Sequence, residues 1–286
     1  MKETDVFSAA QEFEATDGGK DAWLEEARRA YIRKDERRAQ VVRFLQVGIV
    51  LALLAGWELG ARWGALDPLL FSSPTAVAQL VADLAASGEL WRHVGITVYE
   101  TLLGFALGTL GGVLVALALW FFPLLGRVLD PYLVVLNSLP KIALGPIFIV
   151  AFGSGPRAIV AIAAFVSIFV TIQVLTSAFA GVDANFLRLA YSLGASRLDV
   201  FRKIVFPASL STLLAALKVN IGLAWIGVIV GEFLVARQGL GALIVYGFQV
   251  FNFRYVYAGI LLVALLATAM YALASAAERM CGRGPR

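Results

Sequence analysis

Two long runs of the sequence contain no charged residue, and they restrict the folds open to the chain. They are Ala158–Phe179 and Val256–Ala277, each 22 residues long. A helix needs about 20 consecutive apolar residues to cross the hydrocarbon core of a bilayer, and a buried helix of a soluble protein rarely stays uncharged for so long. The composition agrees, because 60% of the residues are hydrophobic and only 15% are charged. The chain is therefore expected to be a polytopic membrane protein.

The pattern of apolar runs predicts an all-α membrane protein with six transmembrane helices. A further helix is expected after Ser73-Pro74, because serine caps a helix well, proline suits its first position and Gly88 can end it. This helix is too short to span and carries Asp83, which places it at the outer membrane interface. The predicted spans are 44–61, 94–121, 132–152, 158–179, 208–230 and 256–277.

These spans divide the chain into a basic segment 1–43, a membrane domain 44–277 and a tail 278–286. With the N-terminus inside, the inner segments hold 15 lysines and arginines and the outer segments hold 5. Positive charge is enriched on the cytoplasmic side, so both termini are expected in the cytoplasm and the chain in a bacterial inner membrane. The polar start shows no signal-peptide pattern. Residues 22–40 fit either a helix along the membrane surface or a solvated basic tail.

The segment Phe186–Pro207, on the inner side, is more structured than a simple connection needs to be. It is predicted to form two short helices around Gly194, with Ser196 as the cap of the second helix and Asp199 in its first turn. Pro207 is expected to end that helix where the fifth span begins. An exposed apolar side is expected here and would need a protein partner. Its residues are Leu198, Phe201 and Val205.

This segment resembles the EAA loop of ATP-binding cassette (ABC) importer permeases, whose pattern is Glu-Ala-Ala, three residues, Gly, nine residues and Ile-x-Leu-Pro. The residues in register are Ala190, Gly194, Ile204 and Pro207, and the departures are Arg188, Leu189 and Phe206. Over residues 55–277 the chain is similar to permeases of the nitrate, sulfonate and taurine group. The other shared positions are Ser73-Pro74, Gly88–Trp91, Gly104-Phe105, Asp130-Pro131, Leu139-Pro140, Pro146, Phe152-Gly153, Trp225 and Glu232.

The resemblance implies the type I ABC importer permease fold and a set of partners. Two permease chains would enclose the pathway, a dimer of ATPase subunits would bind ATP and Mg²⁺, and an extracytoplasmic binding protein would deliver the substrate. The loop 186–207 would dock on the ATPase. The residues assigned to this coupling are Ala190, Gly194, Ala195, Ser196, Phe201, Ile204 and Pro207. The chain carries no Gly-rich phosphate loop, so we expect no cofactor, no catalytic residue and no ATP hydrolysis in this chain.

The resemblance suggests a small anion as substrate, such as a sulfonate, nitrate or taurine. Related permeases also serve neutral aromatic or pyrimidine-type vitamin precursors, so this alternative stays open. A secondary transporter is less well supported, because the deep charges are mainly lysines. A membrane-embedded enzyme, a metal site or a nucleic-acid partner is not expected from a chain with one histidine, one cysteine and arginines that flank its spans.

The third span is expected to be broken. Two prolines and a glycine lie within Asn137–Pro146, and irregular backbone at membrane depth is tolerated only against protein or a water-filled cavity. Such breaks often mark the substrate site of a transporter. A lysine at this depth is costly and usually functional, but a structural pairing of Lys141 with a carboxylate or a carbonyl is equally open. The pathway candidates here are Asn137, Ser138, Pro140 and Lys141.

Further pathway candidates lie in the fifth span. Lys218 and a glutamate, either Glu232 near the outer end of the same span or Glu100 of the second span, pair to orient helices or line the route. Trp225, with Asn220, either packs against the substrate or only against neighbouring helices. His93 is expected to be structural. The small residues expected at close helix contacts are Gly104, Gly108, Gly111 and Gly112.

Overall fold

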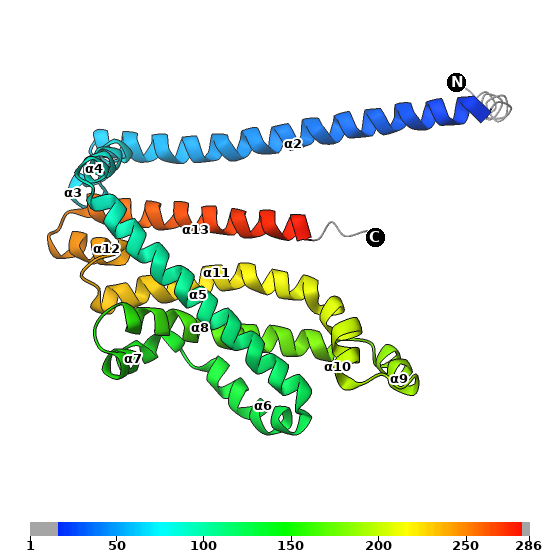
Figure 1. Cartoon of the computed structure of the whole chain (residues 1–286). Coiled ribbons are helices and arrows are strands. Elements are labelled where there is room, and N and C mark those ends of the chain that lie inside the picture. Colours follow the sequence, from blue (N-terminus) through cyan, green and yellow to red (C-terminus); the bar gives the residue numbers. More distant parts are fainter. Residues whose placement is uncertain (1–16, 282–286) are drawn as a thin grey trace. The chain divides into compact units, whose positions relative to one another are not determined.

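The structure is a computed structural model that describes residues 17–281; the side chains of most of residues 17–39 and of residues 68, 277, 280 and 281 are not described. Every regular element in this range is a helix (Figure 1). The chain forms two units, of which the first ends at Ala65 and the second begins at Leu66.

The second unit contains all helices after α2. Those before the loop 186–207 are α3 (Pro68–Phe71), α4 (Pro74–Ser87), α5 (Glu89–Phe121), α6 (Pro123–Ser138), the 3-10 helix η1 (Lys141–Leu144), α7 (Gly145–Phe152) and α8 (Pro156–Ala180). The remainder are α9 (Ala184–Ser192), α10 (Arg197–Val200), the π-helix η2 (Phe201–Val205), α11 (Phe206–Val235), α12 (Leu240–Gln249) and α13 (Phe253–Cys281). Figure 1 shows α12 at one end of this unit and α9 at the other, and these are called the α12 end and the α9 end below.

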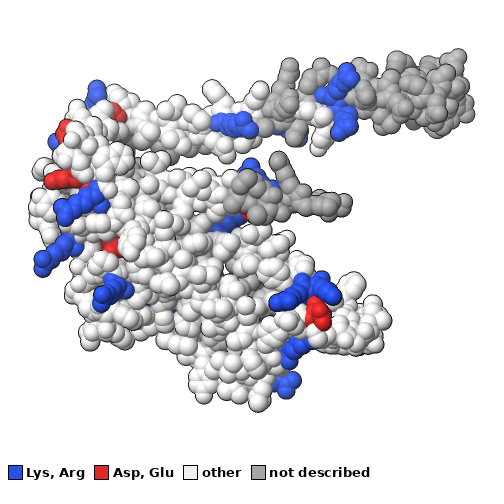
Figure 2. Space-filling view, viewed as in Figure 1, with Lys and Arg blue, Asp and Glu red and all other residues white. Residues whose placement is uncertain are grey.

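The apolar helices confirm the predicted number of spans. Within residues 17–281, five helical stretches are long and apolar enough to cross a membrane, and a sixth crossing results if α6 and η1–α7 form one bent span. On the face drawn in Figure 2, most charged side chains of the second unit lie toward its two ends, with an uncharged surface between them. The all-α, six-span fold is therefore confirmed, although several helices are longer than predicted.

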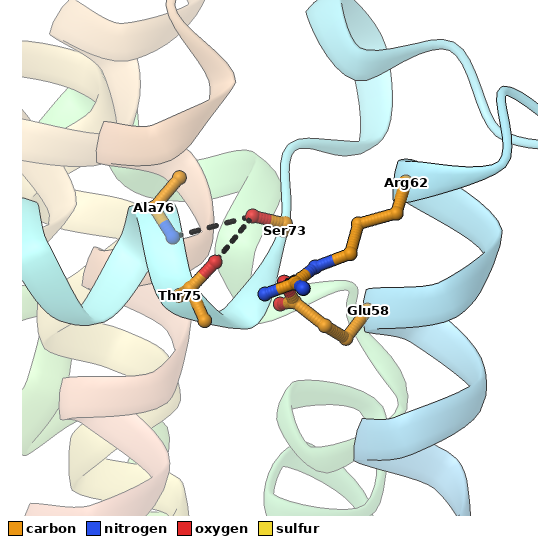
Figure 3. Close-up of polar contacts among 5 residues, drawn as sticks. All are labelled: Glu58, Arg62, Ser73, Thr75 and Ala76. Carbon is orange, nitrogen blue, oxygen red and sulfur yellow. Dashed lines mark hydrogen bonds and ion pairs between the residues drawn. The ribbon is translucent and has the colours of Figure 1, made fainter.

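Helix α2 (Asp17–Arg62) makes up the described part of the first unit. It runs for 46 residues, so the helix predicted within 22–40 continues into the predicted first span without a break. Its last turn holds an ion pair in which Arg62 Nε donates to Glu58 Oε1 over 2.7 Å (Figure 3). A position of residues 22–40 along the membrane surface stays a prediction, and residues 1–16 and 282–286 lie outside the described range.

Helix α4 begins and ends at the residues that the sequence predicts. Ser73 caps it, because its side chain accepts a hydrogen bond from the Ala76 backbone over 3.2 Å and lies 3.1 Å from the Thr75 hydroxyl (Figure 3). Gly88 ends α4 with a φ of 84°, in the left-handed region that glycine tolerates best. The next residue, Glu89, starts α5, so the second span is five residues longer at this end than predicted.

Helices α5, α8 and α11 pack closely through small residues and form the core. A Cβ atom placed on Gly104 would lie 2.5 Å from the Ala163 side chain, and one on Gly112 would lie 2.4 Å from Thr171. Gly227 of α11 meets the same Ala163 from the other side, at 2.5 Å. Such approaches exclude any larger residue, so the predicted glycine contacts of α5 are confirmed as close helix packing.

Candidate transport pathway and coupling surface

The predicted break in the third span lies between α6 and η1. Helix α6 ends at Ser138, and Leu139 is extended, with a ψ of 141°. The residue before a proline avoids the helical region, so Pro140 explains why α6 ends there. The chain resumes as η1 and α7 after a bend of 91°. The irregular backbone is therefore Leu139-Pro140, one residue before Lys141.

Lys141 is held at this bend by carbonyl oxygens. Its ammonium group donates to the backbone oxygen of Asn137 over 2.8 Å and to the side-chain oxygen of Asn137 over 3.2 Å. The Asn137 amide in turn donates to Gln173 Oε1 of α8 over 2.6 Å. Among the described residues, no carboxylate lies within ion-pair distance of Lys141. Its charge is thus partly solvated by carbonyl groups but not neutralised.

A polar cavity of about 400 Å³ lies between α6 and α8, beside this cluster. Asn137 and Ser138 line it from α6, and Gln173 lines it from α8. Gln173 is not among the residues that the sequence singled out. A glutamine in the middle of the uncharged run 158–179 is a usable signal, because an amide facing lipid is costly. Three of the predicted pathway residues, Asn137, Ser138 and Lys141, are therefore gathered at one place.

Lys218 lies elsewhere and has a partner. Its ammonium group forms an ion pair with Glu278, near the end of α13. Both side chains are partly exposed, at 22% and 31%. Of the two interpretations open for Lys218, the structure supports helix pairing, but with a glutamate 60 residues away rather than with Glu100 or Glu232.

Glu232 is buried at the α12 end, where it joins three helices. Only 1% of its surface is exposed. It accepts a hydrogen bond from the Thr97 hydroxyl of α5 over 2.7 Å and another from the Gly241 backbone at the start of α12. Thr97 accepts from the Leu240 backbone over 2.8 Å. A carboxylate beside the first backbone N–H groups of a helix is favourable, so Glu232 anchors α12, which supports the helix-orienting interpretation.

The residues around Glu232 are also buried or closely packed. Glu100 of α5 is 1% exposed and in hydrogen-bond contact with the Glu232 carboxyl group. The His93 ring nitrogen lies 3.0 Å from the Gly239 backbone nitrogen, which supports the structural role expected for His93. A Cβ on Gly239 would lie 2.2 Å from the Glu232 carboxyl group, so only glycine fits there. We call Thr97, Glu100, Glu232 and the Gly239–Gly241 turn the α12 junction.

Trp225 and Asn220 are packing residues in this chain. Trp225 is 4% exposed and lies among helices of the core. The Asn220 amide donates to Thr109 of α5 over 3.0 Å and to Thr171 of α8 over 2.6 Å. Asn220 thus ties α11 to both neighbours at the small-residue contact, and the burial of Trp225 supports the packing interpretation for that residue.

The loop between α8 and α11 turns at Gly194, as predicted. Gly194 has a φ of 81°, the Ala195 N–H donates to the Ala190 carbonyl over 3.0 Å, and the Gly194 N–H donates to the Tyr191 carbonyl over 3.0 Å. This pair of hydrogen bonds is a Schellman motif, which ends a helix on a left-handed glycine. Ala190, Gly194 and Ala195 therefore act together as the end of α9.

Helix α10 starts with the predicted cap but does not end at Pro207. The Ser196 side chain accepts from the Asp199 backbone, and the Asp199 carboxylate accepts from the Ser196 backbone, which completes a capping box. Beyond α10 the helix widens into the π-helix η2 and continues directly into α11. The expectation that Pro207 ends the helix is wrong, because the wide turn before it accommodates a residue without an N–H donor.

The prediction of an exposed apolar side on this loop is also partly wrong. Phe201 is 8% exposed and Val205 is fully buried, and both pack with Ala116 of α5 and Phe179 of α8. The turn of η2 brings them onto the ends of these helices, so Phe201 belongs to the chain's own core. Leu198 is exposed as predicted. The other large apolar residues exposed in the loop are Phe186, Leu189, Tyr191, Leu193 and Phe206.

A shallow hollow of about 300 Å³ lies in the corner between α9 and α10. Four residues assigned to coupling line it: Ala190, Gly194, Ala195 and Ile204. Ser196 and Pro207 are exposed beside it, and the Lys203 ammonium group lies 3.7 Å from Asp199. The loop thus presents a hollow, an apolar rim and charged groups, held in place by its own hydrogen bonds. Such a surface fits a protein partner.

The chain combines apolar helices long enough to cross a membrane with a helix that is broken beside Lys141. Its loop 186–207 is held in shape by its own hydrogen bonds. These features are typical of a membrane transport subunit. The chain belongs to the family described as binding-protein-dependent transport system inner membrane component, which matches residues 108–280. It is the permease subunit of an ABC importer.

Individual relatives agree with this family. The chain is 30% identical to the putative aliphatic sulfonates transport permease protein SsuC of Escherichia coli, over 83% of this chain and 89% of that protein. It is 28% identical to the riboflavin transport system permease protein RibX of Chloroflexus aurantiacus, over 82% and 87%. Its fold matches a chain of the MetNI methionine ABC transporter with a TM-score of 0.54 at 17% identity, over 66% of this chain and 94% of that chain.

Proposed function

We propose that two copies of this permease enclose a pathway for a small anion, and that the bend at Leu139-Pro140 borders it. The observation that carries the proposal is the charge of Lys141. It lies within the predicted third span, beside a polar cavity, and no described carboxylate neutralises it. A cation in this position is costly unless it meets water or an anion. A sulfonate, nitrate or taurine-like substrate would supply the missing charge.

A neutral vitamin precursor is the second candidate substrate. The specific observation in its favour is that the chain is about as similar to a riboflavin permease as to a sulfonate permease. The polar groups of Asn137, Ser138 and Gln173 can hydrogen-bond a neutral ring as well as an anion. The two candidates differ in one respect: only the anion needs the charge of Lys141.

The proposed partners follow from the α9 end. The loop 186–207 would lie on the cytoplasmic side and dock on a separate ATPase subunit, which would hydrolyse ATP with Mg²⁺. A binding protein would deliver the substrate at the α12 end. The hollow beside Gly194 and the exposed apolar rim support this assignment, since an uncovered apolar surface of this kind marks an interaction site.

The first experiment tests whether the chain is a coupled importer. The permease is expressed with the ATPase and binding protein encoded beside it, purified through a tag on the permease and reconstituted in liposomes. The ATPase should co-purify, and the loaded binding protein should stimulate hydrolysis. Uptake that continues without the ATPase and depends on an ion gradient would show a secondary transporter instead.

The second experiment changes Lys141 to Met, which removes the charge and keeps a similar length. Uptake of taurine or ethanesulfonate should fall about tenfold or more, because an ion at this depth loses its only counter-charge, whereas uptake of riboflavin should change little. Lys218→Met is the matched control, since Lys218 already has Glu278 as its partner. Unchanged uptake and unchanged stimulation of the ATPase in Lys141→Met would make Lys141 merely structural.

A further inference from the structure

The polar cavity beside Lys141 is one part of a longer groove between α6 and α8. A second cavity, of about 650 Å³, continues from it toward the α9 end. The two share the lining residues Asp130, Leu133 and Thr176, so they adjoin each other. The groove therefore runs from Asn137, next to the bend, to Arg127 and Arg197 at the α9 end.

Helix α8 carries two polar faces with different roles. Ser167 and Thr171 are fully buried, donate to backbone oxygens of their own helix and face the core, where Thr171 accepts from Asn220. Gln173, Thr176 and Ser177 all line the groove. Their spacing of three and four residues places them in one row on the helix. We call these three residues the α8 row.

The α8 row is difficult to explain as a lipid-facing or packing surface. Gln173 and Ser177 are exposed within this chain, and the row lies in a run of 22 residues without a charge. An amide in contact with hydrocarbon leaves its hydrogen-bonding groups unsatisfied at a cost of several kcal/mol. A water-filled groove removes that cost. The row therefore indicates water, or a polar solute, along α8.

The hydrogen bonds at the bend also orient Gln173. Lys141 donates to Asn137, and Asn137 donates to the carbonyl oxygen of Gln173. This arrangement uses the Gln173 carbonyl and leaves its amide nitrogen, a double donor, for the groove. Lys141, Asn137 and Gln173 thus form a series of hydrogen-bond donors that begins at the charge of Lys141 and ends on α8. A solute with a hydrogen-bond acceptor or an anionic group would therefore meet hydrogen-bond donors first at the bend.

We infer that the α8 row is the second wall of the substrate pathway, facing Asn137 and Ser138 on α6, and that Gln173 is a specificity-determining residue in it. The inference rests on the proposed pathway at Lys141 and extends it from one helix to a groove with two walls. A solute would leave the bend between Gln173 and Asn137 and move past Thr176 and Ser177 toward the α9 end.

Cysteine labelling tests this inference without knowledge of the substrate. The chain has one cysteine, so Cys281→Ser provides a cysteine-free permease, which is labelled within the complete transporter and then separated from the other subunits by gel electrophoresis. Gln173→Cys and Ser177→Cys are then treated in inside-out membrane vesicles with the anionic reagent 2-sulfonatoethyl methanethiosulfonate. Ser167→Cys is the matched control on the same helix, because Ser167 is fully buried. N-ethylmaleimide after unfolding in detergent counts the total thiol.

The two groove thiols should react about tenfold faster than the control, because only thiols in water ionise and meet the charged reagent. Adding Lys141→Met should slow the anionic reagent at Gln173→Cys severalfold and leave the cationic trimethylammonium reagent unaffected or faster. Equal rates at all three positions, or no reaction at positions 173 and 177, would overturn the inference. Neither result depends on whether the ATPase co-purifies, so failure of the transporter assignment is recognised separately.

Discussion

The two ends of the second unit are built in opposite ways. At the α12 junction, side chains are buried and hydrogen bonds connect residues more than 130 positions apart, as between Thr97 and Glu232. At the α9 end, the hydrogen bonds of Gly194 and Ser196 are local, and large apolar side chains such as Leu193, 78% exposed, face outward. The first arrangement fixes helices to each other, whereas the second presents a preformed surface.

This difference indicates where movement can enter the bundle. A junction whose buried polar groups hydrogen-bond across helices resists displacement, because each separated group loses its partner in a low-dielectric site. A loop held by its own caps can be pushed as a unit without losing its shape. The loop is also connected to α8 and α11 through buried Phe201 and Val205, so a force on it reaches the core helices.

The strongest test of this comparison is Glu232→Ala, for which we expect the largest effect. The change leaves the buried Gly241 N–H without its acceptor, at about 1–3 kcal/mol, and leaves the Thr97 hydroxyl only the His93 backbone oxygen at 3.1 Å. The purified permease should melt many degrees lower in detergent or fail to accumulate. Glu232→Gln keeps one acceptor oxygen and should lower the melting temperature much less. A melting temperature for Glu232→Ala equal to that of the unmodified chain would show that the junction is not what holds α12.

Features of this fold that depend only on residues adjacent in the chain could be predicted from the sequence. The cap at Ser73, the break within Asn137–Pro146 and the turn at Gly194 each follow from a few adjacent side chains, and the structure confirms all three. The close glycine contacts of α5 follow from the spacing of Gly104, Gly108 and Gly112, which a single helix face explains.

Features that depend on distant contacts are missed. The partner of Lys218 is 60 residues away, so two interpretations stayed open until the fold placed Glu278 beside it. Phe201 reads as exposed in a short loop, but η2 turns it onto α5 and α8. Gln173 carries no motif, and although its amide stands out in an uncharged run, only the groove shared with α6 shows which side of α8 it faces.

Gly194→Val tests the other side of the comparison, and a smaller loss of stability is expected. No atom lies within 4 Å of a Cβ placed on Gly194, so the cost is the left-handed backbone alone, about 1–2 kcal/mol. The protein should therefore remain folded in the membrane, while the altered turn weakens ATPase binding and abolishes stimulation by the binding protein. Pull-down of the ATPase and its stimulated activity measure both effects.

Gly95→Val is the control for this change. A Cβ on Gly95 also has open space, but Gly95 lies within α5 and has no left-handed backbone. Gly95→Val should have the melting temperature of the unmodified permease, and it should bind the ATPase and support stimulated hydrolysis to the same extent. If Gly194→Val assembles with the ATPase and transports normally, the loop is not the coupling element, whereas the family assignment is unaffected because it rests on the match over residues 108–280.

The smallest effect is expected at the ion pair between Lys218 and Glu278, which lies outside both regions. Partly exposed pairs contribute about 0–1 kcal/mol, so Lys218→Met should lower the melting temperature slightly and leave uptake within about twofold of normal. The exchange Lys218→Glu with Glu278→Lys restores opposite charges and should recover the lost stability, which a role for Lys218 in the pathway would not predict. Loss of uptake in Lys218→Met as large as in Lys141→Met, with unchanged melting and no recovery in the exchange, would place Lys218 on the substrate route. The pathway would then extend to α11, and the helix-pairing interpretation would be wrong.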